Sequence, residues 1–99
     1  MAAYVIADVE VTDPAVFAEY RRQVSATIEQ YGGKYLVRGG ATEKVEGDWD
    51  PHRLVIIQFE SLERARQWHD SQEYRGPMKL RHQSANTNVV LVEGVQETI

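Results

Sequence analysis

Two segments of this chain are apolar on both faces when they are read as β-strands. Every position is apolar in residues 54–57, Leu-Val-Ile-Ile, and in residues 89–92, Val-Val-Leu-Val. An antiparallel sheet with one face in water instead alternates apolar and polar residues along each strand. A sheet built from these segments therefore has two apolar faces to cover, and an exposed apolar face on the order of several hundred Å² is typical of an interface.

Four segments have the pattern of β-strands, and they are residues 3–11, 34–46, 53–60 and 86–95. In the first, apolar residues recur at every second position, which predicts a strand. Gly39 and Gly40 interrupt the second, so we expect a bulge or sharp bend there before residues 41–46 resume the extended pattern. A turn-rich loop over residues 47–51 then precedes the third strand.

Two helical segments separate these strands. Asp13 can cap the first helix and Pro14 suits its first position, while a Gly-Gly pair ends it. Ser61 caps the second helix and Ser71 restarts it. The Gly-Pro pair at residues 76–77 should weaken or delay the restarted helix, because proline lacks the N–H that an internal helical position donates.

The order βαββαβ predicts an α+β fold of the ferredoxin-like type, with an antiparallel sheet. Right-handed crossovers place both helices on one side of that sheet. The other side is left bare although it is apolar, and two such sheets packed face to face would cover each other. We therefore expect a homodimer built from a single domain that spans residues 1–99, with a core over about residues 3–95.

Composition narrows the class of protein. Eleven basic and fifteen acidic side chains give a formal charge of -4, and the basic residues are scattered, so a nucleic-acid partner is not expected. The absence of cysteine removes disulfides and thiolate chemistry, which suits the cytoplasm. The N-terminus lacks the basic region of a signal peptide, and no apolar run approaches the roughly 18 residues that cross a bilayer.

The sequence resembles a known family in several stretches. These are Ala3-Tyr4-Val5-Ile6-Ala7, Gly32 to Gly40, Glu46-Gly47-Asp48-Trp49 and Ser71-Gln72-Glu73-Tyr74. They are similar to the domain of unknown function 1330 (DUF1330) family, over Tyr4 to Val95. The resemblance implies the dimeric α/β-barrel group of ferredoxin-like proteins, whose members include cofactor-independent oxygenases, isomerases and ligand-binding modules. A shared fold does not choose among these functions.

Trp49 is the first candidate site residue, because an indole that is exposed to water in the polar loop 47–51 is costly to hydrate. It packs against the partner chain or the domain's own helix, or it forms a wall over a pocket. The βαββαβ path brings Asp48, Trp49 and His52 near the start of the first helix.

Arg38 and Arg53 are candidates for binding a carboxylate or phosphate with the planar guanidinium fork. The glycines after Arg38 leave room beside it. The simpler interpretation is cross-strand ion pairing, since a hairpin closed by residues 47–52 puts Arg38 roughly opposite Glu60 and Arg53 opposite Glu46.

The remaining candidates are residues that could act as a general base and tyrosines that could line a pocket. His52, His69 or Asp8 could act as a general base, whereas Tyr20 and Tyr74 are either core residues or phenols that point into a cleft. The histidine spacing matches no compact metal motif, so neither a metal site nor a cofactor is expected.

Three hypotheses remain open. The first is a binder of a small organic molecule, and of an acid if Arg38 is the anchor. The second is a cofactor-independent oxygenase or isomerase, and the third is a structural or regulatory dimer without a ligand. The sequence leaves open whether the protein is an enzyme.

Overall fold

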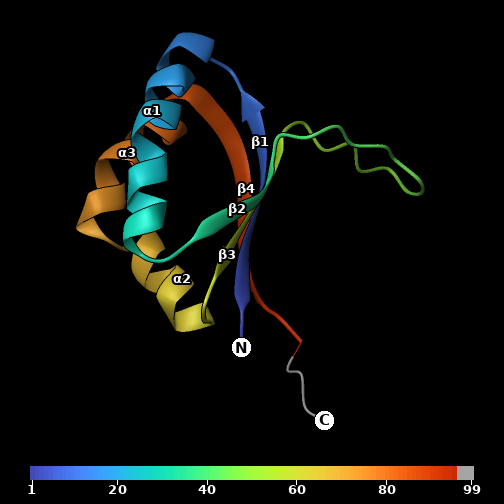
Figure 1. Cartoon of the computed structure of the whole chain (residues 1–99). Coiled ribbons are helices and arrows are strands. Elements are labelled where there is room, and N and C mark those ends of the chain that lie inside the picture. Colours follow the sequence, from blue (N-terminus) through green and yellow to red (C-terminus); the bar gives the residue numbers. More distant parts are fainter. Residues whose placement is uncertain (96–99) are drawn as a thin grey trace.

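A computed structural model describes residues 1–95 as a four-stranded antiparallel sheet with three helices on one face (Figure 1). The strands lie in the order β2-β3-β1-β4. The elements along the chain are β1 (Ala3–Val11), α1 (Pro14–Gln30), β2 (Lys34–Arg38), β3 (Leu54–Phe59), α2 (Leu62–His69), α3 (Gln72–Ser84) and β4 (Ala85–Glu93). The predicted α+β, ferredoxin-like class is confirmed, and residues 96–99 of the expected domain lie outside the described part.

Strand β1 is central in the sheet, and its side chains alternate between the two faces. Its small apolar side chains, Ala3, Val5, Ala7 and Val9, are buried under the helices. The alternate positions point to the other side, which we call the open face. It is formed by Tyr4, Ile6 and Asp8 of β1 with their neighbours on β3 and β4.

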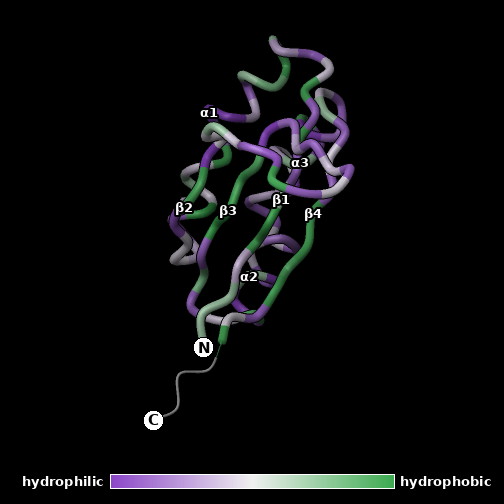
Figure 2. The backbone as a smooth tube through the Cα atoms, turned by 90° about the vertical axis from the view of Figure 1, so that its right-hand side faces the viewer, coloured by the Kyte–Doolittle hydropathy of each residue, from purple (hydrophilic) through white to green (hydrophobic). Residues whose placement is uncertain are grey.

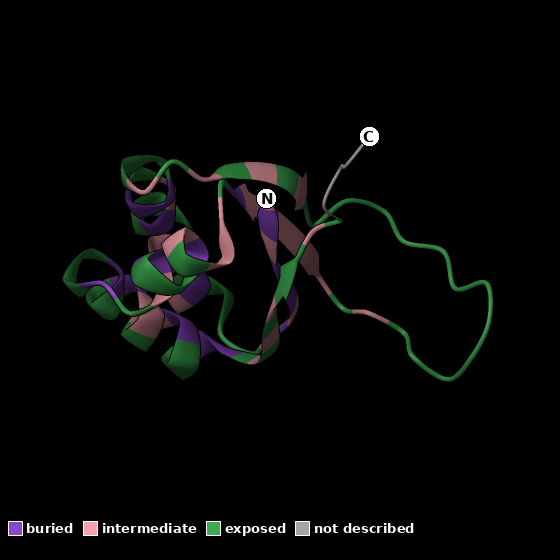
Figure 3. Cartoon of the chain, turned by 90° about the horizontal axis from the view of Figure 1, so that it is seen from below, coloured by how far each residue is buried: buried purple, intermediate pink, exposed green. Residues whose placement is uncertain are grey.

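The middle row of the open face is wholly apolar, because Ile6 lies opposite Ile56 of β3 and Val90 of β4. Figure 2 looks onto this face and shows apolar residues along β3 and β4. Figure 3 shows that the helices cover only the opposite side of the sheet. Val90 is 56% exposed and Val92 is 43% exposed, so the described chain leaves this apolar surface in water.

Helix α1 begins and ends as its sequence predicts. The Asp13 carboxylate accepts a hydrogen bond from the backbone N–H of Val16 at 3.3 Å. At the other end, Gly32 has a φ of 78°, and the N–H of Gly33 reaches the carbonyl of Ile28 at 2.9 Å. This closure satisfies carbonyls that have no partner inside the helix.

The second helical segment is divided into α2 and α3 at Asp70 and Ser71. Ser71 caps α3, since its hydroxyl accepts from the N–H of Tyr74 at 3.1 Å. Helix α3 then runs through Pro77 without a break, so the expected delay at the Gly-Pro pair does not occur. Gly76 favours this path, because a residue without a Cβ reduces the clash with the proline ring that usually disfavours helix before proline.

The β2–β3 hairpin differs from the expected one. Residues 41–46 do not resume a strand, so that prediction was wrong; residues 39–53 form a long loop whose positions 40–50 are all exposed. The bulge lies between Tyr35 and Val37 rather than at the glycines. Charged and polar residues in the loop offer no apolar face that could be held against the sheet, and Figure 1 shows the loop projecting away from the helices.

The ends of the sheet's two longest strands meet. The N–H of Gly94, after β4, donates to the carbonyl of Ala2, before β1, at 2.8 Å. Within the described residues, no helix is both long enough and apolar enough to cross a membrane.

Candidate functional site

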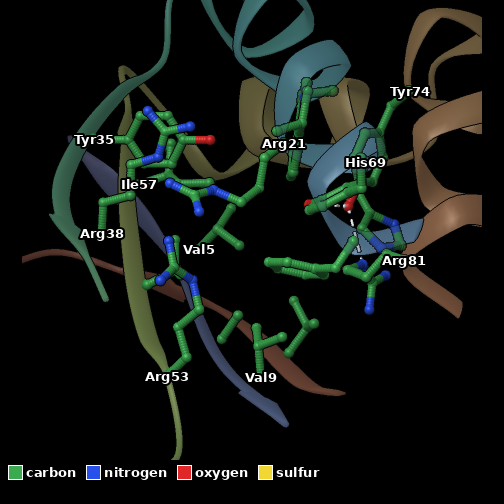
Figure 4. Close-up of a pocket in the computed structure, with 17 residues that line it drawn as sticks. Val5, Val9, Arg21, Tyr35, Arg38, Arg53, Ile57, His69, Tyr74 and Arg81 are labelled. Atoms are coloured by element: carbon green, nitrogen blue, oxygen red, sulfur yellow. Dashed lines mark hydrogen bonds between the residues drawn. The ribbon is translucent and has the colours of Figure 1, made fainter. Parts of the chain in front are cut away.

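A narrow cavity lies between the covered face of the sheet and the helices (Figure 4). Apolar side chains of β1, β3 and α1 form most of its wall, among them Val5, Ile57 and Phe17. Its free volume is about 50 Å³, which holds a few water molecules. Any larger guest must therefore displace the side chains at its mouth.

Three arginines gather on the β2 and β3 side of this cavity. Arg21 lies on α1, Arg38 ends β2, and Arg53 immediately precedes β3. Burial, and then the charges of Arg21 and Arg38, lower the pKa of Arg53 from its ordinary value. The positive charges of these three arginines therefore repel one another, and a bound anion would reduce that repulsion.

None of these three arginines has an acidic partner within 4.0 Å among residues 1–95. The expected Arg38–Glu60 pair is not formed, because the long loop and the bulge put Arg38 opposite Val55. The Arg53–Glu46 pair is not formed either, since Glu46 lies in the exposed loop. Arg38 instead stacks on the Tyr35 ring, with its guanidinium carbon 4.5 Å from the ring centroid.

Tyr20 and Tyr74 meet on the helix side of the cavity. Their hydroxyl oxygens are 3.2 Å apart, and the Nε–H of Arg81 donates to Tyr74 at 3.2 Å. Burial, followed by the proximity of Tyr74, raises the pKa of Tyr20 far above its ordinary value, so Tyr20 stays a neutral phenol. Arg81 itself is only 6% exposed.

His69 also lines the cavity, beside an aromatic cluster. Its ring centroid is 5.9 Å from that of Tyr74 and 6.2 Å from that of Trp68. The Trp68 indole donates to Thr27 at 3.0 Å, which fixes this cluster against α1. An imidazole at this point can exchange a proton with a guest in the cavity.

Trp49, Asp8 and His52 form a separate group on the open face. The Trp49 indole N–H donates to Asp8 Oδ2 at 2.9 Å, and the backbone N–H of His52 donates to Asp8 Oδ1 at 2.8 Å. These bonds, with the Trp49 bond as the largest cause, lower the pKa of Asp8. Asp8 is therefore an anchor for the loop, and its ionised form is a weak base at neutral pH.

The predicted site residues thus divide between the two faces of the sheet. Arg38, Arg53, Tyr20, Tyr74 and His69 line the cavity. Trp49, His52 and Asp8 lie beyond it, as described above. Asp48 is exposed and does not line the cavity, although it is adjacent to Trp49.

Sequence reasoning missed Arg21 and Arg81. Arg21 follows Phe17 by four residues on α1, and Arg81 follows Tyr74 by seven on α3. Both spacings keep two side chains on one helix face, so the helical period could have found them. Among residues 1–95, no three histidine, aspartate or glutamate side chains are grouped so that they could hold a metal ion.

A model of the family described as Domain of unknown function (DUF1330) matches residues 2–95 of the sequence. The chain belongs to the DUF1330 family. The resemblance predicted from its sequence stretches is therefore confirmed. Membership of the DUF1330 family does not by itself assign a specific activity to this protein. No curated protein matches the chain.

Solved structures share the fold of this DUF1330 protein at low sequence identity. A protein of unknown function from Rhodopseudomonas palustris has a TM-score of 0.78 and 16% identity, covering 97% of this chain and 84% of that one. SnoaB, a cofactor-independent oxygenase from Streptomyces nogalater, has a TM-score of 0.59 and 11% identity, covering 97% and 94%. These likenesses establish the ferredoxin-like fold and leave the function to be argued from the site.

Proposed function

We propose that this DUF1330 protein binds a small organic acid in the cavity between sheet and helices. The observation that carries the proposal is the convergence of Arg21, Arg38 and Arg53 on one cavity, with no carboxylate within ion-pair distance among the described residues. Guanidinium groups bind carboxylates through two parallel hydrogen bonds. The apolar wall behind them suits the hydrocarbon part of such an acid.

The size of the cavity restricts how the acid enters. Its free volume of about 50 Å³ is well below the roughly 300 Å³ that drug-sized ligands occupy. Arg21 and Arg38 are exposed, so their long side chains can turn outward without disturbing the core. A slim acid whose carboxylate replaces this arginine cover is therefore the expected guest.

A panel of carboxylic acids and their neutral amides tests the proposal by isothermal titration calorimetry. The wild-type protein should bind at least one acid and not its amide, because the amide lacks the charge that the arginines select. Arg53→Met should weaken that binding about tenfold or more, as expected when a hydrogen-bonded charge is lost.

The matched control is Arg22→Met. Arg22 neighbours Arg21 on α1 but is exposed and paired with Glu19 on the same helix. The Arg22→Met substitution changes the net charge of the molecule as much as Arg53→Met does, but it leaves the cavity wall unchanged. Equal weakening by both substitutions, or no acid bound by the wild type, would refute the proposed site.

A second candidate function is catalysis without a cofactor, favoured by the position of His69 in the cavity wall beside Tyr74. SnoaB shows that this fold can support an oxygenase, although the likeness itself extends only to the fold. To test this candidate, the protein is incubated in air with the tightest-binding acid, and mass spectrometry then measures the mass of the product. A product that forms with wild type and not with His69→Gln supports catalysis, and an unchanged acid supports binding alone.

We also infer that a second copy of the chain packs on the open face. The apolar row of Ile6, Ile56 and Val90 is the supporting observation, since helices cover the sheet on one side only. An identical face is complementary to itself around a two-fold axis, which is the common symmetry of homodimers.

A further inference from the structure

The cavity has a second cationic end, formed by Arg81 of α3. This guanidinium is 6% exposed and lines the cavity, yet it has no carboxylate within 4.0 Å among residues 1–95. A buried charge without a counter-charge is destabilising, because it has lost its hydration without gaining an ion pair. Figure 4 shows Arg81 on the opposite side of the cavity from Arg38 and Arg53.

We propose that the guest carries two carboxylates, one at each end of an apolar body, so that the site selects dicarboxylic acids. This inference rests on the proposed function and adds the second charge to it. Val5 and Val9 lie between the two cationic sides in Figure 4, so the lining between the two ends is apolar and matches an uncharged hydrocarbon spacer.

Arg81 has donors left for a ligand. A guanidinium offers five N–H donors. One is bonded to Tyr74 at 3.2 Å, and Nη2 lies 3.5 Å from His82 Nε2, a long contact. The bond to Tyr74, which in turn touches Tyr20, fixes the plane of the guanidinium. The remaining donors are therefore pre-organised for a planar carboxylate.

The narrowness of the cavity distinguishes carboxylates from phosphates. Because the free volume is only about 50 Å³, a flat carboxylate at each end needs less displacement of side chains than a bulkier tetrahedral phosphate would. Two arginine-bound ends also explain why four arginines line one small cavity whose wall contains no acidic residue.

Calorimetry with paired acids tests the inference on the full-length protein. The probes are straight-chain α,ω-dicarboxylates of increasing length, each compared with the monocarboxylate of the same length. We expect affinity to peak at one length, where the dicarboxylate binds about tenfold or more tightly than its monocarboxylate partner. Arg81→Met should remove this preference, so that each dicarboxylate binds no more tightly than the monocarboxylate of the same length.

Arg75→Met is the matched control, because Arg75 is exposed on the same helix and lies outside the cavity wall. The inference is supported if Arg81→Met loses the preference for dicarboxylates while the wild type and Arg75→Met keep it. Equal binding of both acids by the wild type overturns it while the organic-acid site stands. No binding of any acid by the wild type overturns the proposed function as well. Should Arg81→Met fail to fold, the wild-type comparison alone decides.

Discussion

Gly39 shapes the mouth of the cavity at the scale of a single residue. Its φ of 70° lies in the left-handed region, which a side chain disfavours. A Cβ at this position would also overlap the guanidinium of Arg53. Glycine is therefore required here both by the backbone and by the place that Arg53 occupies.

Gly39→Ala should lower the free energy of unfolding by about 1–2 kcal/mol, the usual cost of a left-handed non-glycine residue, and should also weaken acid binding by displacing Arg53. Urea denaturation measures the first effect and calorimetry the second. Gly40→Ala is the control, because a Cβ there meets no neighbour within 4 Å and its φ is not positive. Similar losses in the two variants would contradict this account of Gly39.

Among the elements, the loop over residues 39–53 is held to the sheet through Asp8. The Asp8 carboxylate accepts both the Trp49 indole and the His52 backbone N–H, and these bonds favour its ionised form. Because the folded-state pKa is lowered, this stabilisation is fully present above the unfolded pKa of about 4. It is lost as the pH falls through the lower folded-state pKa.

Acidification below about pH 4 should therefore release Trp49 and shift its fluorescence toward that of free indole in water. Asp8→Asn should show the released spectrum already at neutral pH, since a neutral amide is a weaker acceptor for the indole. The Trp49→Phe variant reports the signal of the buried Trp68 and is subtracted. An acid transition that is the same in wild type and Asp8→Asn would rule out this anchor.

Element by element, the sequence predicts those parts whose signals are local. The caps at Asp13, Ser61 and Ser71 and the alternation in β1 each act within a few residues, and the structure has all of them. Residues 41–46 mislead because alternation without a partner strand does not make a sheet. A strand depends on a neighbour that the sequence pattern alone does not name.

The candidate site is less predictable than the fold for the same reason. Arg38 and Tyr74 stand out by type and context, but their shared cavity depends on how α1 and α3 pack over the sheet. The predicted ion pair of Arg38 with Glu60 assumed a short hairpin loop, and a longer loop changes every opposite pair. Arg81 belongs to no motif; its helical spacing from Tyr74 puts it on the same face of α3, and only the structure shows that it is buried.

On the scale of the whole molecule, the open face is the surface on which we expect a second copy of the chain to pack. Ile56→Glu places a charge in the middle of its apolar row, so we expect the variant to be a monomer where the wild type is a dimer. Light scattering coupled to size-exclusion chromatography measures the mass of each. Gln67→Glu, which adds the same charge on exposed α2, should leave the dimer intact. A wild-type mass of one chain at micromolar concentration would contradict the pairing.

The contact between Gly94 and Ala2 has a consequence for the covalent order of the chain. Since the N–H of Gly94 already reaches the carbonyl of Ala2 at 2.8 Å, a short linker could join these two residues directly. The backbone could then be reopened in the exposed loop near Gly47, where no strand pairing is interrupted. Such a circularly permuted protein should keep the same sheet and the same cavity, while its new ends emerge beside Trp49.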